Sequence, residues 1–224
     1  MGTDIAFKRP DGADAKGYLA NAAAGNAPGV VVIQEWWGLS EQIKAMCDRF
    51  ALAGFDALAP DLFKGVVVPY HDTERAGKEM SSLNFIAAVD QDVRGAVQFL
   101  RRNGAKAGVA GFCMGGAIAV IGAARLPDLA AAVSFYGLPP AQAAKPADVK
   151  VPLQAHFANR DDFVTPKAAD DFEKAMRAAG KDFECFRYDA DHAFVNEQRM
   201  AVHDRHAAEL AWGRATAFLR RHLA

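Results

Sequence analysis

Hydrophobic positions along the chain follow two alternating patterns. Short apolar runs without polar interruption, such as Gly29–Gln34 and Ala107–Phe112, are typical of strands buried on both faces of a sheet. Between such runs, apolar residues recur every three or four positions, which is the spacing of one helix face. This alternation predicts an α/β fold with a mostly parallel central sheet and crossover helices on both faces.

The expected elements can be placed along the whole chain. A hairpin opens it, because residues 4–8 and 16–20 flank the turn-forming sequence Pro10-Asp11-Gly12. Six further strands are expected at 29–34, 55–60, 107–112, 131–136, 151–157 and 183–188. Helices are expected at 40–54, 85–103, 114–126, 166–179 and 197–222, with a short one near 73–82. No repeat or linker interrupts this order, so residues 1–224 are predicted to form a single domain.

Composition and charge exclude several classes of protein. The 26 lysines and arginines nearly balance 27 acidic residues, whereas a nucleic-acid-binding domain is usually strongly basic. No apolar run approaches the roughly 18 residues of a membrane span, and the N-terminal residues lack the pattern of a secretory signal. Three cysteines are an odd count and too few for a disulfide framework. We therefore expect a cytoplasmic protein without nucleic-acid or membrane partners, either a monomer or a weak homo-oligomer.

The strongest chemical signal is the sequence GFCMGG at residues 111–116, which follows a predicted strand and opens a predicted helix. It matches the nucleophile-elbow pattern G-x-S-x-G with Cys113 in the serine position. Small neighbours suit this strained turn, which points the side chain at a helix N-terminus. There the helix dipole favours a thiolate and backbone N–H groups can hold an oxyanion. The alternative is a buried structural cysteine in a glycine-rich turn.

Candidate partners follow Cys113 in the order acid, then histidine, which is the order of α/β-hydrolases. Asp161 and Asp162 come after one predicted strand, and His192 comes after the next. The carboxyl ends of parallel strands meet at one edge of a sheet, so these side chains are expected to lie together. His192 would take the thiol proton or hold the thiolate as an ion pair, and an aspartate would fix the imidazole tautomer. The spacing leaves open which aspartate acts and which one caps the following helix.

These motifs together resemble the dienelactone hydrolase family, the carboxymethylenebutenolidases. The resemblance rests on GFCMGG at 111–116, DDFV at 161–164, HAF at 192–194, QEWWG at 34–38 and APDLF at 59–63. It extends from about residue 28 to the end of the chain and implies an α/β-hydrolase fold. By this resemblance Asp161, and not Asp162, is the triad aspartate. No nucleotide-binding motif is present in the sequence, and neither a metal nor a cofactor is predicted.

The resemblance also implies roles around the triad. Glu35 matches a glutamate that contacts the resting thiol and moves when substrate binds, so that the thiolate forms only with substrate present. The alternative for Glu35 is an ion pair with a nearby arginine. The backbone N–H groups of Trp36 and Met114 are expected to form the oxyanion hole, as one early loop residue and the residue after the nucleophile do in this fold.

Substrate recognition is where the chain departs from the family pattern. An arginine that anchors the substrate carboxylate four residues after the histidine is replaced by Asn196, and a neutral amide cannot form a charge-assisted pair. Arg75 is the candidate for a second anchoring arginine. The pocket is expected to be lined by Trp36, Trp37, Phe135, Tyr136 and Phe163.

The predicted function is hydrolysis of a small enol lactone through a thioester on Cys113. The change at Asn196 leaves open a cysteine-dependent esterase or thioesterase that acts on a neutral small substrate. Two further alternatives are a non-catalytic protein of the same fold that binds a small ligand and a thiol redox protein. The last would need Cys47 or Cys185 close to Cys113 in space.

Overall fold

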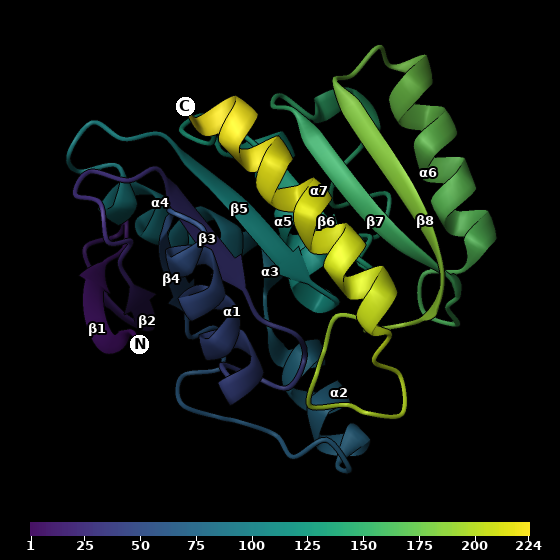
Figure 1. The fold of residues 1–224 in the computed structure, drawn as a ribbon, viewed down its shortest axis with the longest axis horizontal. Coiled ribbons are helices and arrows are strands. Elements are labelled where there is room, and N and C mark those ends of the chain that lie inside the picture. Colours follow the sequence, from purple (N-terminus) through teal and green to yellow (C-terminus); the bar gives the residue numbers. More distant parts are fainter.

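One eight-stranded sheet organises the chain, and the computed structural model describes it over residues 1–224 (Figure 1). The strands are β1 (Thr3–Lys8), β2 (Asp14–Ala20), β3 (Gly29–Ile33), β4 (Asp56–Pro60), β5 (Ala107–Phe112), β6 (Ala132–Phe135), β7 (Leu153–Arg160) and β8 (Phe183–Asp191). Their order in the sheet is β1-β2-β4-β3-β5-β6-β7-β8. The six strands from β4 to β8 pair in parallel, whereas β1 and β2 are antiparallel. The sheet is therefore mostly parallel, as the sequence predicts.

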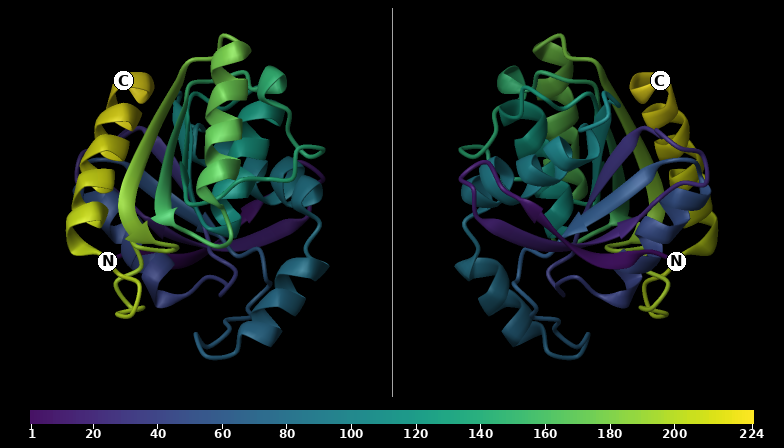
Figure 2. Two further views of the ribbon diagram at one scale, coloured as in Figure 1. Left: turned by 90° about the vertical axis from the view of Figure 1, so that its right-hand side faces the viewer. Right: turned by 90° about the vertical axis from the view of Figure 1, so that its left-hand side faces the viewer.

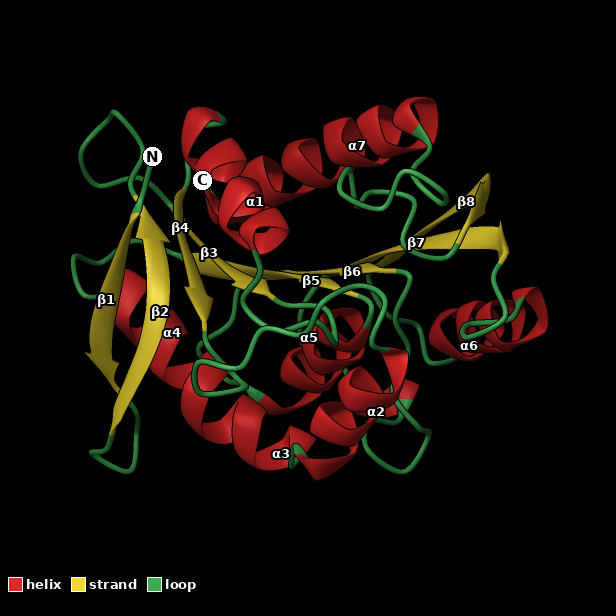
Figure 3. Cartoon of the chain, turned by 90° about the horizontal axis from the view of Figure 1, so that it is seen from below, coloured by secondary structure: helices red, strands yellow, loops and turns green.

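Helices cover both faces of this sheet. They are α1 (Glu41–Leu52), α2 (Thr73–Ser82), α3 (Phe85–Ala87), α4 (Arg94–Leu100), α5 (Met114–Arg125), α6 (Pro166–Ala178) and α7 (Arg205–Leu223). Figure 3 shows α1 and α7 on one face, with α4, α5 and α6 on the other. A π-helical turn, η1 (Ala88–Val93), joins α3 to α4, and a 3-10 turn, η2 (Pro146–Asp148), precedes β7. No helix of the structure has the length and apolar character needed to cross a membrane.

The β3 strand shows why its sequence lacks polar alternation. Val30 and Val32 pack into the core beneath α1 and α7, while Val31 and Ile33 pack into the core on the opposite face. All four side chains are fully buried. Successive side chains of a strand point to opposite faces, so a strand covered by helices on both sides must be apolar at every position.

The largest error in the expected elements lies before the C-terminal helix. We predicted a helix from residue 197, but α7 begins at Arg205. The Asp204 side chain accepts a hydrogen bond from the Ala207 N–H, and the Asp204 N–H bonds to the Phe194 carbonyl, so the helix is capped there. Residues 192–204 instead form a loop that follows β8. This loop carries Asn196 into the candidate site.

Two smaller expectations also differ from the structure. The cap of α6 is Thr165, whose hydroxyl accepts from the Ala168 N–H, and neither neighbouring aspartate caps the helix. The helix expected over 85–103 ends at Leu100 and contains the π-helical turn. Neither difference moves the carboxyl ends of the parallel strands.

The segment between β4 and α3 projects from the sheet at the end where the parallel strands terminate. It contains α2, which buries only Ala76 and is capped by Asp72, whose carboxylate accepts from the Arg75 N–H. Figure 2 shows α2 and the 192–204 loop at the same end of the molecule. These two segments, together with the turns after β3 and β5, enclose the candidate site.

Candidate active site

Cys113 occupies the sharp turn between β5 and α5. Its backbone angles are φ 53° and ψ −116°, a strained conformation for a residue with a side chain. Two glycines permit the turn: a Cβ atom on Gly111 would lie 1.9 Å from the Gly115 carbonyl oxygen, and one on Gly115 would lie 2.3 Å from the Ile33 carbonyl oxygen. The Cys113 N–H donates to the Phe135 carbonyl at 3.0 Å. The motif at 111–116 thus forms the turn that its sequence predicts.

Three side chains from different strand ends meet at this turn. His192 Nε2 lies 3.2 Å from Cys113 Sγ, and His192 Nδ1 lies 2.8 Å from Asp161 Oδ2. The Asp161 side chain is fully buried, and its Oδ1 accepts hydrogen bonds from the N–H groups of Phe163 (2.8 Å) and Val164 (2.9 Å). These two bonds hold the carboxylate in place, which in turn fixes the orientation of the imidazole.

The partners of His192 determine its protonation. Burial alone would lower the pKa of His192, but its hydrogen bonds with Asp161 and Cys113 raise it to about 10. The ring therefore favours the imidazolium form near neutral pH. The distance of 3.2 Å between Cys113 Sγ and His192 Nε2 places the imidazole where it can take the thiol proton or pair with a thiolate.

Two backbone N–H groups that follow β3 and β5 have no acceptor in the protein. Met114 is the first residue of α5 and therefore has no intrahelical acceptor for its N–H. The Trp36 N–H, in the turn after β3, donates to no acceptor of the protein. Both donors follow carboxyl ends of neighbouring strands, since β3 and β5 are paired. Both N–H groups are therefore available to donate hydrogen bonds to the oxyanion that forms during acyl transfer.

A cavity of about 400 Å³ opens over Cys113. Its ten lining residues are Glu35, Trp36, Trp37, Thr73, Met80, Cys113, Phe163, His192, Ala193 and Arg199. The Trp36 ring contacts the rings of Trp37 (5.1 Å between centroids) and Phe163 (5.9 Å), and Phe163 lies 4.8 Å from the His192 ring. Aromatic surface therefore surrounds the sulfur and the imidazole. A cavity of this size and composition suits a small organic molecule.

Glu35 lines the same cavity and is almost fully buried. Its Oε1 accepts a hydrogen bond from the Tyr136 hydroxyl at 3.2 Å, and its Oε2 accepts from Asn196 Nδ2 at 2.7 Å. Burial raises the pKa of Glu35, against the opposing effect of the Asn196 hydrogen bond. Glu35 forms no ion pair with an arginine, so that alternative from the sequence is wrong. Both oxygens accept instead from neutral donors.

The remaining residues expected in the pocket separate into three groups. Trp37 and Phe163 line the cavity. Tyr136 packs edge-on against the His192 ring at 5.2 Å and reaches the site through its hydroxyl. Phe135 and Arg75 do not line the cavity: Phe135 is fully buried beneath the site, and Arg75 is exposed.

The placement of Arg75 follows from helix geometry. Thr73, Ala76 and Met80 recur at the spacing of one α2 face, and this face turns toward the site: Thr73 and Met80 line the cavity, and Ala76 is buried against Trp37. A residue one position before Ala76 points about 100° away around the helix, since an α-helix has 3.6 residues per turn. Arg75 consequently faces solvent.

Arg199 is the lining residue that the sequence analysis missed most completely. It comes from the loop after β8, and its guanidinium lies 5.7 Å from the centre of the Trp37 ring. No motif contains it, and the helix we predicted from residue 197 concealed it. The signal that would have found it is Asp204, because recognising that cap leaves residues 197–203 in a loop at the carboxyl end of β8.

Comparisons with known proteins give the family of this chain. The sequence pattern of the dienelactone hydrolase family matches residues 15–223. The chain belongs to this family. Protein usf of Aquifex pyrophilus is 38% identical over 100% of both chains, and a carboxymethylenebutenolidase-like protein of Aquifex aeolicus is 34% identical over 100% of both chains.

The fold is shared with solved structures of the dienelactone hydrolase family. The crystal structure of a dienelactone hydrolase-like protein from Klebsiella pneumoniae is similar with a TM-score of 0.84 and 28% sequence identity. The similarity covers 97% of this chain and 98% of that one. The sheet and its helices are therefore those of an α/β-hydrolase.

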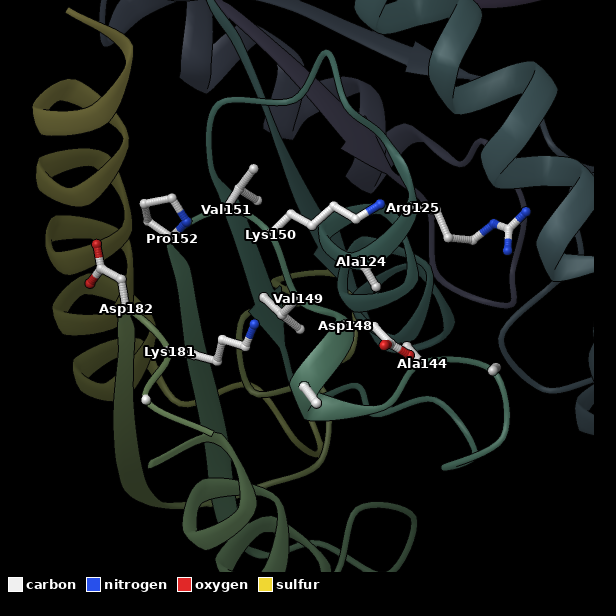
Figure 4. A pocket seen from close by; sticks show the side chains of 13 residues that line it. Ala124, Arg125, Ala144, Asp148, Val149, Lys150, Val151, Pro152, Lys181 and Asp182 are labelled. Carbon is white, nitrogen blue, oxygen red and sulfur yellow. The ribbon is translucent and has the colours of Figure 1, made fainter. Parts of the chain in front are cut away.

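A second, larger hollow of about 980 Å³ lies at the other end of the sheet (Figure 4). It is formed where α5 ends and where β7 and β8 begin, and its charged side chains include Lys150 and Lys181. No cysteine, serine, threonine or histidine lines it. Its ionisable lining is limited to aspartates, lysines and an arginine, whereas the cavity over Cys113 brings a thiol and an imidazole into contact.

Proposed function

We propose that this member of the dienelactone hydrolase family opens a small enol lactone through a thioester on Cys113. The observation that carries the proposal is the chain of contacts from Asp161 through His192 to Cys113 Sγ at the mouth of an aromatic cavity. A pure binding protein has no need of a buried aspartate behind the histidine. Hydrolase activity is also the activity named in the family to which the chain belongs.

The steps follow from the positions of the side chains. The Cys113 thiolate attacks the lactone carbonyl carbon, and the oxyanion is held by the N–H groups of Trp36 and Met114. The ring C–O bond then breaks, so the acyl group stays on sulfur and the ring oxygen leaves as an enolate. The enolate takes the proton of the His192 imidazolium, and the neutral ring then takes a proton from the water that adds to the thioester. The C–S bond breaks, the carboxylic acid leaves, and the thiolate and the imidazolium are restored. The enolate is stable enough to leave readily and basic enough to help activate that water.

Glu35 is assigned the control of thiol ionisation. It lines the same cavity as Cys113, and its buried carboxyl group is held by Tyr136 and Asn196 while the sulfur contacts His192. Movement of Glu35 away from these two partners would change the charge next to the sulfur. A thiolate that forms only with substrate is protected from oxidation when the site is empty.

A second candidate function is hydrolysis of a neutral ester or thioester by the same residues. The observation that favours it is Asn196, which stands where the family pattern has an arginine and donates to Glu35 instead of facing the cavity. Under this candidate, Cys113 and His192 keep their roles and the substrate lacks a carboxylate.

The test is loss of dienelactone (4-carboxymethylenebut-2-en-4-olide) with the wild type, Cys113→Ala and Cys113→Ser. We expect turnover by the wild type, none by Cys113→Ala, and less than about a tenth of the wild-type rate for Cys113→Ser, because a serine oxygen is not ionised by the same histidine. Near-full activity of Cys113→Ser would contradict a cysteine-specific mechanism. Turnover of neutral esters alone favours the second candidate, and saturable binding without product by all three proteins contradicts both.

A further inference from the structure

The cavity over Cys113 has a closed end and an open end, each marked by an aromatic side chain. Trp37 lies at the closed end, where it is 1% exposed and covered by Tyr70 and α2. Phe163 lies at the open end, with 69% of its surface exposed. The Trp36 ring contacts both of these rings. The cavity therefore runs from the interior to solvent along one row of aromatic side chains.

The exposure of Phe163 is fixed by the fold. It is the only exposed residue among the 15 phenylalanines of the chain. Its N–H donates to Asp161 Oδ1 at 2.8 Å, and the N–H of the buried Val164 donates to the same oxygen at 2.9 Å. The backbone beneath the ring is thus held by the same hydrogen bonds that hold the candidate triad aspartate. An aromatic ring kept in water in this way gains free energy when a planar apolar group covers it.

The open end is also the side on which a leaving group can be protonated. The His192 ring lies 4.8 Å from the Phe163 ring and makes no such contact with Trp37. When the C–O bond of the substrate breaks, the acyl carbon stays on Cys113 Sγ and the leaving oxygen takes the proton of the His192 imidazolium. The leaving oxygen therefore lies on the side of His192, and the group attached to it extends toward Phe163. The acyl group is left with the closed end of the cavity.

We propose that Phe163 determines specificity for the group on the leaving oxygen, by packing against a planar aryl or enol group. The inference deepens the proposed function and rests on it for the identity of the reacting bond. The substrate class is an aryl ester, an enol ester or an enol lactone. Its acyl part is short because Trp37 and α2 close that end of the cavity, whereas its planar part can reach solvent over Phe163.

A different role for Phe163 makes a different prediction. Its ring also shields His192, and with it the hydrogen bond between His192 and Asp161, from water. If shielding were its only role, removal of the ring would slow all esters equally, whatever their leaving group. The preference between two leaving groups is therefore the property that separates substrate recognition from shielding.

The experiment compares phenyl acetate with hexafluoroisopropyl acetate, whose leaving alcohol is similarly acidic but not planar. The proteins are the wild type, Phe163→Ala, Phe163→Tyr and the control Met200→Ala, which shortens another exposed apolar side chain that does not line the cavity. We expect Phe163→Ala to lower the ratio of kcat/KM for phenyl acetate over hexafluoroisopropyl acetate by about tenfold, mainly through KM. Phe163→Tyr should keep the ratio of the wild type, and Met200→Ala should leave it unchanged.

Phenyl hexanoate adds a second comparison, because it lengthens only the acyl group. The ratio of kcat/KM for phenyl acetate over phenyl hexanoate should be the same in all four proteins, since the acyl group lies away from Phe163. Equal losses for the two acetates in Phe163→Ala, or an unchanged ratio between them, would overturn the proposal. A change confined to the ratio for acyl length would overturn it as well.

Failure of the proposed function looks different, because the wild type would then hydrolyse none of the three esters. In that case calorimetry with 2-naphthol, a planar leaving group without an acyl part, decides the role of Phe163 independently of turnover. Binding to the wild type that is lost in Phe163→Ala and kept in Met200→Ala supports the proposal. Absence of 2-naphthol binding to the wild type contradicts it.

Discussion

Two buried histidines, His156 on β7 and His192 directly after β8, have pKa values shifted in opposite directions. His156 on β7 is fully buried, and burial lowers its pKa to about 3. His192, after β8, is also largely buried, yet its contacts with Asp161 and Cys113 raise its pKa to about 10. Burial alone favours the neutral ring in both cases. The comparison shows that the partners, and not the burial, separate the candidate catalytic histidine from a structural one.

The partners of His156 form one directed series of hydrogen bonds. Arg214 donates to the Tyr188 hydroxyl at 3.1 Å, which leaves that hydroxyl to donate to His156 Nδ1 at 2.8 Å. His156 Nε2 can then donate to the Gln154 Oε1 atom at 2.9 Å, and Gln154 Nε2 donates to Glu184 at 2.6 Å. Every group in the series is satisfied with His156 neutral, so a proton on the ring would disrupt it.

The ring of His156 also belongs to a stack across four strands. Phe112, Phe135, His156 and Phe186 occupy partnered positions on β5, β6, β7 and β8. Adjacent rings in this order lie 4.6, 4.7 and 5.6 Å apart and are nearly parallel. Phe112 directly precedes Cys113, so the structural histidine supports the floor of the site without reaching the cavity.

The sharpest test of this contrast is Asp161→Asn. The substitution keeps the size of the side chain but removes the charge that stabilises the His192 imidazolium and fixes its tautomer. We expect kcat to fall by about 10³–10⁴-fold while the protein remains folded, as measured by steady-state kinetics and circular dichroism. Asp162→Asn is the matched control, because Asp162 is exposed and does not contact His192. A similar loss in both variants would contradict the assignment of Asp161.

For His156→Phe we expect the reverse, a loss of stability with little change in kcat. This variant keeps the ring stack but leaves Tyr188 and Gln154 without their partner, so we expect it to lower the free energy of unfolding by about 2–3 kcal/mol near pH 8. Urea denaturation measures this loss. The kcat of the folded protein should remain within about threefold of the wild type, since His156 does not line the cavity.

The same variant also tests the pKa of His156. Between pH 6.5 and about 3 the unfolded chain binds a proton that native His156 does not, so the wild type loses stability as the pH falls. This contribution amounts to about 1.4 kcal/mol per pH unit and is absent from His156→Phe. The stability difference between the two proteins should therefore shrink below pH 6.5. A difference that stays constant down to pH 4 would show that the buried ring is not held neutral.

The smallest effect is expected for Glu35→Gln, which removes a charge beside the reactive pair without removing a member of it. If Glu35 restrains ionisation of the resting thiol, Cys113 in this variant should react with iodoacetamide several-fold faster than in the wild type at pH 7. Mass spectrometry can follow alkylation at each cysteine, with buried Cys47 as the internal control. An unchanged rate at Cys113 would leave Glu35 with a purely structural role.

The parts of the fold that the sequence predicts well are those in which packing restricts the residue type at each position. β3 is recognisable because both of its faces are covered, and GFCMGG is recognisable because the turn excludes larger residues at Gly111 and Gly115. The order of residues in the triad predicts His192 and one of the two aspartates. Only the family resemblance selects Asp161 over Asp162.

The walls of the cavity were harder to predict because no periodic pattern describes the path of a loop. The helix expected over 197–222 includes Arg199, but α7 begins only at Arg205. On α2, the sequence indicates a helix but not which face turns toward Trp37, so it does not show that Thr73 and Met80 line the cavity while Arg75, the candidate anchoring arginine, faces solvent. Both errors concern segments whose positions depend on tertiary contacts.

Helix α2 packs against the rest of the protein through a single buried residue, and this affects how the protein could diversify. Only Ala76 of that helix is buried, and the 192–204 loop supplies another wall of the cavity. Substitutions at Thr73, Met80 or Arg199 would reshape the cavity while leaving the stacked strands beneath Cys113 undisturbed. New substrate preferences are thus accessible through single surface changes that cost little stability, whereas changes at the elbow glycines would be eliminated by selection.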